Sequence, residues 1–403
     1  MNHKKIDRRE FLGRTGLGAA AAGMGLPAIE RETFQPSSLP DLVYRTLGRT
    51  GLRIPVVSFG VMNTNSNALI RYSIDAGINH LDTANVYLDG NSERAIGEVL
   101  NGRGKRDDIY ISTKMRFARD RVTNVFISQG SAPEPLATEE NFNSQLETSL
   151  SRLQTDYIDI LYLHSCYSAE MAVYEPMMEC MVKAKESGKA RFIGVSTHKN
   201  VSEVIGAAVD AGVYDVIQIA YNYRGLNREE IKKANRYAAE HNVGIIAMKV
   251  MGGTDLNQDA TVQVDHKAAL RWVIDDENIC TTIPGMTTFE QLELNLSVMS
   301  DLSLSPGENR ELEIASLVQG SLYCQNCRSC ISTCTNSVEI PNLMRAFMYE
   351  RGYGNSYQAG RTIAELPFNT GIDTCRECSA CTAECVNGLQ IRDRIKALIA
   401  EGY

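Results

Sequence analysis

Short apolar runs alternate with amphipathic stretches from residue 43 to about residue 300. Runs of about four to eight apolar residues are typical of buried strands, and longer stretches with apolar positions three or four apart are typical of helices. The predicted strands cover residues 56–60, 80–83, 109–114, 158–164, 191–196, 216–221, 244–250 and 281–284. The predicted helices cover residues 67–76, 92–100, 139–153, 176–187, 201–211, 228–240, 266–275 and 289–299.

This alternation predicts an α/β fold built from parallel strand–helix units. Eight such units in about 250 residues favour a (β/α)8 TIM barrel over residues 43–302. A doubly wound open sheet is the alternative, and it is weakened because no G-x-G-x-x-G motif follows the first predicted strand. In a barrel of this kind the reactive side chains lie at the carboxyl ends of the strands.

The repeating units stop before residues 303–403, which carry a different pattern. Helical periodicity continues at residues 307–320, 341–349 and 391–399, and a C-x2-C-x2-C-x3-C spacing occurs twice. The cysteines of the two copies are Cys324, Cys327, Cys330 and Cys334, and then Cys375, Cys378, Cys381 and Cys385. We therefore expect a small C-terminal α-helical domain that holds a metal group.

The cysteine spacing resembles that of bacterial two-cluster ferredoxins, in which the fourth cysteine of each run ligates the other cluster. By this resemblance the tail is a ferredoxin-like domain with two [4Fe–4S] clusters. One cluster would take Cys324, Cys327, Cys330 and Cys385, and the other Cys375, Cys378, Cys381 and Cys334. Two local quartets are the alternative ligation, and Thr335 and Val386 stand where the ferredoxin pattern has proline. A structural zinc site and a disulfide framework are the competing interpretations of these cysteines.

Composition and charge argue against nucleic acid as a partner and against a membrane-spanning segment. The 403 residues carry a formal net charge of −8, and no basic stripe is visible, which argues against nucleic acid. No apolar run reaches the ~18 residues that a membrane-spanning helix needs, so we expect no integral membrane segment.

The N-terminus has the pattern of a targeting segment. Lys4, Lys5, Arg8 and Arg9 form a basic region, and residues 8–12 resemble the twin-arginine export signal R-R-x-[FL]-L. A Gly/Ala-rich stretch follows up to residue 26. We expect a twin-arginine signal peptide at 1–29, a linker at 30–42 and a location in the periplasm or cell envelope, because this route exports proteins already folded around their cofactors.

Four polar residues fall at the ends of neighbouring predicted strands. Asp82 and Tyr87 end or follow the second strand, Lys114 ends the third and His164 ends the fourth. A carbonyl that accepts hydride must also receive a proton, and Tyr87 can supply it. We expect Lys114, held by Asp82, to lower the pKa of Tyr87, and His164 to hydrogen-bond the carbonyl oxygen.

The segment 77–97, GINHLDTANVYLDGNSERAIG, resembles the signature of the aldo-keto reductases. The surroundings of Lys114 and His164 are similar to the rest of that family's catalytic tetrad. The resemblance covers about residues 43–300, and with the cysteine tail the chain resembles the ferredoxin-bearing branch of the family. It implies Tyr87 as proton donor and NAD(P)H as cofactor.

The same resemblance implies where the nicotinamide cofactor binds. Ser196 and Gln218 would contact the carboxamide. The backbone at the start of the helix at 289–299 would lie beside the phosphates, with Gly285 just before that helix and Asn295 within it. The charged residues of the NADP-preferring pattern are replaced by Gly285 and Gln291, so the choice between NAD and NADP stays open.

Two functions of different kinds follow from these patterns. In the first, the chain is an NAD(P)-dependent aldo-keto reductase-like oxidoreductase for a small carbonyl or sugar substrate, with clusters that pass single electrons between the barrel and a redox partner protein. In the alternative, the barrel is a non-catalytic scaffold and the chain is an electron carrier or binding protein. The presence of Asp82, Tyr87, Lys114 and His164 together favours the enzyme.

Overall fold

The computed structural model describes residues 40–104, 106, 108–120, 123–252, 264–319 and 324–403. The expected signal peptide, residues 1–29, and residues 30–39 of the expected linker lie outside the described residues. Of the remaining linker residues, Leu42 packs against the main hydrophobic core.

Within the described residues, eight parallel strands form one sheet in the order of the chain, from β3 to β10. The sheet closes on itself, because Val57 bridges Thr282 and Gly60 bridges Gly285 in parallel register, and the Ser58 N–H donates to the Thr282 carbonyl at 2.8 Å. The predicted parallel α/β architecture is thus confirmed as a curled, closed sheet. The strands are β3 (Phe59–Gly60), β4 (His80–Asp82), β5 (Tyr110–Met115), β6 (Ile158–Leu163), β7 (Ala190–Thr197), β8 (Val216–Ala220), β9 (Gly244–Met248) and β10 (Ile279–Thr282).

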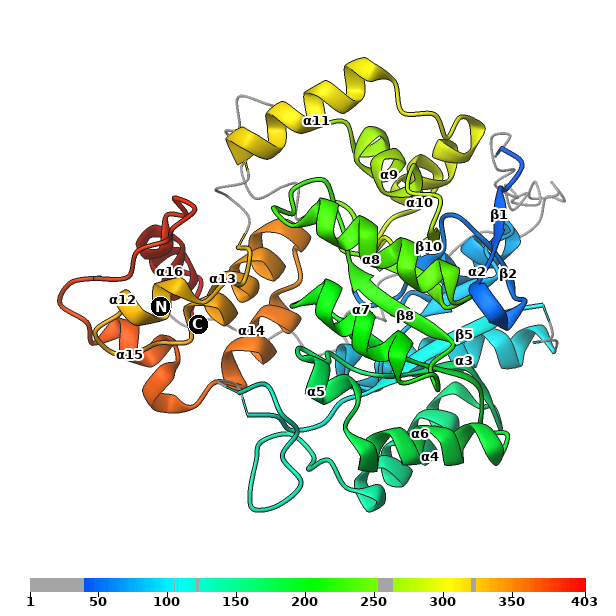
Figure 1. Cartoon of the computed structure of the whole chain (residues 1–403), viewed down its shortest axis with the longest axis horizontal. Helices are drawn as coiled ribbons and strands as arrows, with labels where there is room; N and C mark the ends of the chain where they lie inside the picture. Colours follow the sequence, from blue (N-terminus) through cyan, green and yellow to red (C-terminus); the bar gives the residue numbers. More distant parts are fainter. Residues whose placement is uncertain (1–39, 105, 107, 121–122, 253–263, 320–323) are drawn as a thin grey trace, which may run out of the picture. The chain divides into compact units, whose positions relative to one another are not determined.

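Helices follow the strands and surround the sheet (Figure 1). Polar caps fix where several begin; the hydroxyls of Ser66 and Thr138 accept the backbone N–H three residues on, at the starts of α2 and α4. The helices are α2 (Asn67–Asp75), α3 (Asn91–Arg103), α4 (Glu139–Leu153), α5 (Ala169–Ala172), α6 (Glu175–Glu186), α7 (Val201–Asp210), α8 (Arg228–Glu240), α9 (His266–Ile274) and α10 (Phe289–Leu296).

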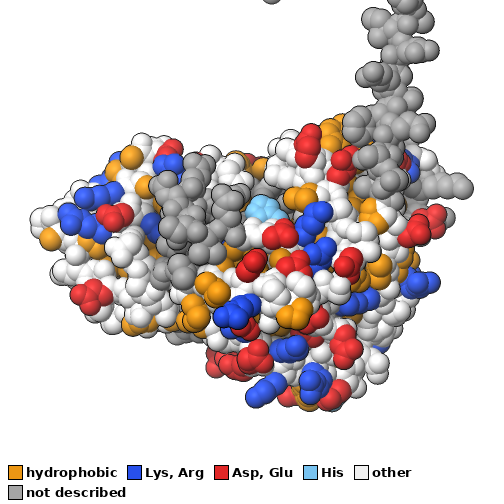
Figure 2. Space-filling view, turned by 90° about the horizontal axis from the view of Figure 1, so that it is seen from above, with side chains coloured by type: hydrophobic (Ala, Val, Ile, Leu, Met, Phe, Trp, Pro, Cys, Tyr) orange, Lys and Arg blue, Asp and Glu red, His pale blue; other side chains and the backbone are white. Residues whose placement is uncertain are grey.

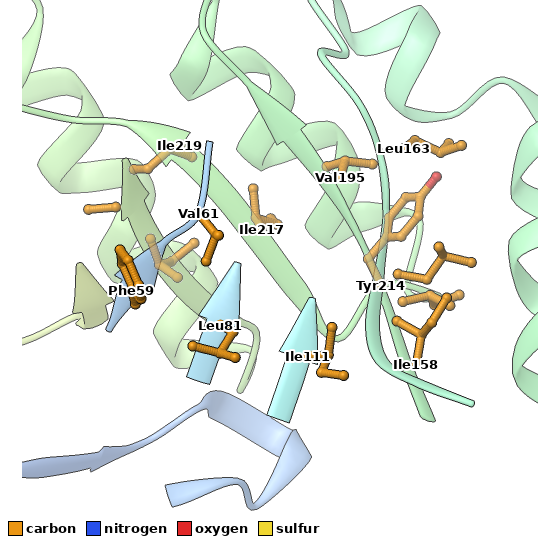
Figure 3. Packing of buried hydrophobic residues seen from close by; sticks show 14 of the residues in the cluster. Phe59, Val61, Leu81, Ile111, Ile158, Leu163, Val195, Tyr214, Ile217 and Ile219 are labelled. Atoms are coloured by element: carbon orange, nitrogen blue, oxygen red, sulfur yellow. The ribbon is translucent and has the colours of Figure 1, made fainter. Parts of the chain in front are cut away.

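Alternate residues of each strand belong to two different apolar clusters. In β6, Leu161 and Leu163 join the large cluster between sheet and helices, whereas Ile160 and Tyr162 join a smaller cluster inside the ring. Figure 3 shows members of the large cluster on neighbouring strands. Burial on both faces explains why these strands are continuous apolar runs rather than alternating ones.

A two-stranded antiparallel hairpin precedes the ring and was not predicted from the sequence. Its strands are β1 (Tyr44–Thr46) and β2 (Arg53–Pro55), joined by the 3-10 turn η1 (Gly48–Thr50). Leu47, Leu52 and Ile54 belong to the interior cluster, so the hairpin fills the amino end of the ring. Strands of three residues are too short for a periodic signal.

All regular secondary structure in the described residues of the C-terminal region is helical, and the region has a core of its own built around Leu343, Ile395 and Leu398. In Figure 1, α13 and α14 lie between the strand–helix units and the helices α12, α15 and α16. The elements are η4 (Ser297–Ser300), α11 (Pro306–Gln319), α12 (Ser329–Thr333), α13 (Ile340–Phe347), the π-helix η6 (Met348–Gly352), α14 (Ser356–Ala364), η7 (Phe368–Thr370), α15 (Ile372–Arg376) and α16 (Ile391–Ala400).

The charges on the surface and the lengths of the helices bear on binding to nucleic acid and to membranes. On the face in Figure 2, Lys/Arg and Asp/Glu side chains are interspersed, without a continuous basic patch among the described residues. In the part of the chain that the structure describes, no helix has the length and apolar character required to cross a bilayer.

Candidate active site

A cavity of about 840 Å³ lies at the carboxyl ends of the strands. The strand ends and their loops supply Asp82, Tyr87 and His164 to its wall. The C-terminal region supplies further wall residues from α13, η6, α14 and the segments that follow η6 and α14. They are Arg345, Tyr349, Arg351, Gly352, Tyr353, Gly354, Gln358, Thr362 and Glu365. The tail therefore forms part of the site rather than a separate body.

The structure brings the four expected catalytic residues together. Asp82 ends β4, Lys114 lies in β5, His164 follows β6, and Tyr87 begins the turn η2 (Tyr87–Gly90). The Lys114 Nζ lies 5.3 Å from the centroid of the Tyr87 ring. The Tyr87 and His164 rings meet edge to face with centroids 5.8 Å apart.

A buried ion pair lies beneath Tyr87. The Lys114 Nζ donates to Asp82 Oδ1 at 2.5 Å and to the Thr83 carbonyl at 2.6 Å. The second carboxylate oxygen of Asp82 accepts from Ser112 Oγ at 2.7 Å and from Gln218 Nε2 at 2.9 Å. Burial lowers the pKa of Lys114, and Asp82 opposes this shift. The network fixes both charged groups in place.

The pKa of Tyr87 moves in the direction opposite to the one expected from the sequence. Burial raises it well above 10, and the charge of Asp82 raises it further. Lys114 does not reverse the shift, because its own charge is neutralised by Asp82 at 2.5 Å. The phenol therefore carries its proton at neutral pH, and transfer of that proton to a much more basic alkoxide is still favourable.

His164 is held in its neutral form. Burial lowers its pKa well below 6.5, and the cations Lys114 and Arg116 lower it further. A neutral imidazole can donate one N–H to a carbonyl oxygen without adding a charge to the site. Its place in the cavity wall beside Tyr87 suits the supporting role expected for this residue.

The turn that carries Tyr87 is conformationally strained. Leu88 and Asp89 have φ values of 50° and 54°, in the left-handed region that non-glycine residues seldom adopt. Arg361 of α14 donates to Asp89 Oδ1 at 2.5 Å and so braces the turn from the tail. Such conformations cost about 1–3 kcal/mol each and persist where surrounding contacts enforce them.

The residues expected to bind the cofactor fall into two groups. Gly285 and Asn295 line the cavity. Ser196 and Gln218 do not line it; the Ser196 Oγ accepts the Ser165 N–H at 3.0 Å, and Gln218 donates to Asp82. Both lie directly beneath the site, since β7 and β8 end there.

Several wall residues were not among the site residues expected from the sequence. Arg116, Tyr167, His198 and Lys249 follow strands β5, β6, β7 and β9, so the rule that selected Asp82 could also have selected them. Arg345 and Tyr349 come from the tail, and nothing in their local sequence indicates that they reach the cavity. Cys166 is buried in the main core, away from the cavity wall.

The cysteines of the tail lie in two groups that mix the two sequence motifs. Burial and the charges of three neighbouring thiols, those of Cys324, Cys385 and Cys327, together raise the pKa of Cys330 to about 12. Burial likewise raises the pKa of Cys375 to about 12, with contributions from Cys334, Cys381 and Cys378. Each group thus contains three cysteines of one motif and the fourth of the other.

The surroundings of these cysteines suit an anionic metal–sulfur group. Arg394 lies close enough to Cys324 and Cys385 for their charges to raise its pKa against the effect of burial. In the second group, the Asn336 Nδ2 donates to the Cys378 Sγ at 3.6 Å, and a cavity of about 100 Å³ adjoins the thiols. Hydrogen bonds and charges near the sulfurs are the features that set the potential of an iron–sulfur cluster.

Among the described residues, no three His, Cys, Asp or Glu side chains are grouped as ligands of one metal ion. A [4Fe–4S] cluster places its four cysteine sulfurs on four different iron atoms, and these sulfurs lie further apart than the ligands of one ion. The donor set of each group, four cysteines with an adjacent donor or cation, fits such a cluster.

Comparison with known proteins agrees with the geometry of the cavity. A phenol, a lysine–carboxylate pair and a neutral imidazole at the carboxyl ends of parallel strands define an oxidoreductase site. The model of the Aldo/keto reductase family matches residues 58–268, so the chain belongs to that family. It is an NAD(P)-dependent oxidoreductase of the aldo-keto reductase type.

The alignments with two curated relatives cover nearly the whole length of each relative. The chain is 26% identical over 334 residues to L-glyceraldehyde 3-phosphate reductase of Escherichia coli O157:H7, covering 69% of this chain and 93% of the relative. It is 24% identical over 313 residues to L-galactose dehydrogenase of Arabidopsis thaliana, covering 68% of this chain and 94% of the relative. About three-tenths of this chain has no counterpart in either.

Solved structures support the fold. The holo form of an aldo-keto reductase from Bacillus halodurans superposes with a TM-score of 0.55 at 22% identity, covering 68% of this chain and 96% of that one. An aldo-keto reductase from Klebsiella pneumoniae, solved in complex with NADPH, superposes with a TM-score of 0.53 at 21% identity over 68% of this chain and 96% of that one.

Proposed function

We propose that the chain interconverts a carbonyl and an alcohol group of a small substrate, with Tyr87 as the proton donor. When bound, NAD(P)H would supply hydride to the carbonyl carbon, and the Tyr87 hydroxyl would give its proton to the carbonyl oxygen. Lys114 and Asp82 hold the phenol in place, and His164 donates a hydrogen bond to the same oxygen. The reverse reaction uses the same groups.

One observation carries this proposal: Asp82, Tyr87 and His164 line one cavity, and Lys114 is paired with Asp82 beneath it. The relatives support the substrate class, because one is named for a phosphorylated triose aldehyde and the other for a sugar. We infer that Gly285 and Asn295, which line the cavity, lie at the phosphate side of the cofactor. We propose that Ser196 and Gln218 support its nicotinamide end from beneath the cavity wall.

Replacement of the phenol tests the mechanism. In Tyr87→Phe we expect the rate of aldehyde reduction, assayed with NADH and with NADPH, to fall about 100-fold or more, because the proton donor is lost. Tyr237→Phe is the matched control, since the Tyr237 hydroxyl bonds Asp210 on the surface. An unchanged rate in Tyr87→Phe would refute the role given to Tyr87.

We further propose that the tail holds two [4Fe–4S] clusters and exchanges single electrons with a redox partner protein. The two mixed groups of cysteines support the crossed ligation, in which Cys385 serves with Cys324, Cys327 and Cys330, and Cys334 with Cys375, Cys378 and Cys381. When bound, the clusters supply one-electron transfer, and the chain's residues hold them and set their potentials.

Iron and sulfide counts on anaerobically purified protein test the clusters. We expect about eight irons and eight inorganic sulfides per chain, from two four-iron groups. Cys385→Ser should remove the same spectroscopic cluster as Cys324→Ser if ligation is crossed, and the same cluster as Cys375→Ser if ligation is local. Zinc, or iron without sulfide, would contradict the proposal.

The export signal remains a proposal and has its own test. We propose that the chain is exported by the twin-arginine route to the periplasm or cell envelope. Lys replacements of both Arg8 and Arg9 keep the charge but remove the arginine pair. They should retain the protein in the cytoplasmic fraction, and equal export of both forms would contradict this route.

A further inference from the structure

The cavity wall carries more positive than negative charge. Among its described side chains, the carboxylates are Asp82 and Glu365, whereas the permanent cations are Arg116, Arg224, Lys249, Arg345 and Arg351. Asp82 is paired with Lys114 at 2.5 Å, and Glu365 is paired with Arg116 at 2.6 Å. Both carboxylates are therefore already neutralised within the protein.

Two of these cations, Arg345 and Lys249, donate hydrogen bonds only to amide and phenol side chains among the described residues, and a phenol is uncharged while it keeps its proton. Arg345 donates to the Tyr167 hydroxyl at 2.9 Å and to Asn342 Oδ1 at 2.8 Å. Lys249 donates to the Tyr349 hydroxyl at 3.3 Å and lies 4.9 Å from the centroid of that ring. Within the described part of the chain, neither cation lies at ion-pair distance from a carboxylate.

Both cations lie close enough to His164, at the catalytic end of the cavity, to lower its pKa. After burial, the causes of the lowered pKa of His164 are all cations, and Lys249 and Arg345 are among them. At His198, Lys249 is the largest cause of the lowered pKa after burial, and Arg345 lowers it too. The positive potential thus extends to the place where the carbonyl oxygen must lie.

The pKa of Tyr167, another residue of the cavity wall, is affected by the same positive potential. Burial alone would raise the pKa of Tyr167, but Arg345, Arg119 and Arg116 lower it to about 7. The Arg119 guanidinium lies 4.3 Å from the centroid of the Tyr167 ring. A phenol with so low a pKa indicates a site that favours an anion.

We propose that Arg345 and Lys249 bind an anionic group, a carboxylate or a phosphate, on the carbonyl substrate, and thereby set substrate specificity. Guanidinium groups bind carboxylate and phosphate oxygens in pairs, and a partly desolvated anion gains more from such contacts than it would in water. Arg345 comes from α13 and Lys249 follows β9, so the anion would join the tail to the strand ends. The proposal rests on the reductase function and names its substrate class.

The specificity is tested with matched pairs of aldehydes. Glyceraldehyde is compared with glyceraldehyde 3-phosphate for the phosphate arm, and butanal with succinic semialdehyde for the carboxylate arm. We expect kcat/KM to be at least about 10-fold higher for the anionic member of one pair, and the arm that shows the larger ratio identifies the group.

Variants at both cations test which residues carry the preference. Arg345→Met and Lys249→Met should each lower the anionic-to-neutral ratio of kcat/KM about 10- to 100-fold, mainly through KM, and Arg345→Lys should restore part of it. Arg310→Gln, on the exposed face of α11, makes the same change in net charge outside the cavity and should leave the ratio unaltered.

Binding to an inactive enzyme separates this inference from the reductase proposal. The affinities of each aldehyde pair are measured by calorimetry on Tyr87→Phe, which needs no turnover. Equal affinities within both pairs would overturn the inference even if neutral aldehydes are reduced by the wild type. Loss of NADPH affinity in Lys249→Met and Arg345→Met with an unchanged substrate ratio would also overturn it, because the cations would then serve the cofactor.

Discussion

Arg116, which follows strand β5, is ion-paired at 2.6 Å with Glu365 at the end of α14. The same guanidinium nitrogen lies 2.7 Å from Glu134 in the long loop after β5. One arginine therefore fastens the tail and the loop to the mouth of the cavity. The pair is largely shielded from solvent, with 17% and 10% of the two side chains exposed.

The Glu365→Gln replacement should loosen this attachment. We expect the free energy of unfolding to fall by about 1–3 kcal/mol, because a charge-assisted contact in a shielded position is lost. Urea denaturation measures the change. Asp373→Asn is the control; its ion pair with Arg376 is exposed and long, at 3.6 Å, and its loss should cost less than about 0.5 kcal/mol.

The Lys114–Asp82 pair should show strong coupling. Lys114→Met alone leaves a buried carboxylate without its cation and should cost about 3–5 kcal/mol of stability. Adding Asp82→Asn removes the stranded charge, so the double variant should be more stable than the sum of the single changes predicts. A double-mutant cycle by urea denaturation measures this, and additive losses would contradict it. All three variants should lose aldehyde reduction.

Tyr167 should titrate far below an ordinary tyrosine. Its pKa of about 7 predicts one tyrosinate that appears in the ultraviolet absorbance near neutral pH and is missing in Tyr167→Phe. The lowered pKa favours the anion in the folded state. The stability of the wild type relative to Tyr167→Phe should therefore grow as the pH rises from about 7 toward 10 and vanish below about 7. A titration near 10 in both proteins would contradict the assignment.

Arg394 should set the potential of one proposed cluster only. Reduction adds negative charge beside Cys324 and Cys385, and Arg394 stabilises that charge. Arg394→Gln should therefore lower the potential of that cluster by about 50 mV and leave the other unchanged, in a redox titration followed by electron paramagnetic resonance. Equal shifts of both clusters would argue against local control by this residue.

The sequence predicts the ring of strands well because the signal is strong there. The run at residues 158–164 becomes β6 (Ile158–Leu163), since a strand buried on both faces is apolar at every position. Asp82, Lys114 and His164 could be selected because the carboxyl ends of parallel strands meet at one mouth. The hairpin was missed because its strands have three residues each.

The electrostatics could not be predicted in the same way. Whether Lys114 acidifies Tyr87 depends on burial and on the 2.5 Å contact with Asp82, and spacing along the chain reports neither. Arg345 and Tyr349 lie in a helical stretch whose pattern indicates only an apolar face. Their position in the cavity wall follows from how α13 and η6 pack against the strand ends, which is a tertiary property.

Because α13, η6 and α14 complete the wall of the cavity, the closed sheet with its helices and the C-terminal region cannot evolve independently of each other. A descendant that lost the tail would expose Lys249 to solvent, leave Arg116 with one carboxylate fewer and release the strained Leu88–Asp89 turn. Its mouth would need new residues before it could turn over any substrate selectively. Truncation and recruitment of foreign tails should therefore be rare among descendants that keep Arg116, Asp89 and Lys249.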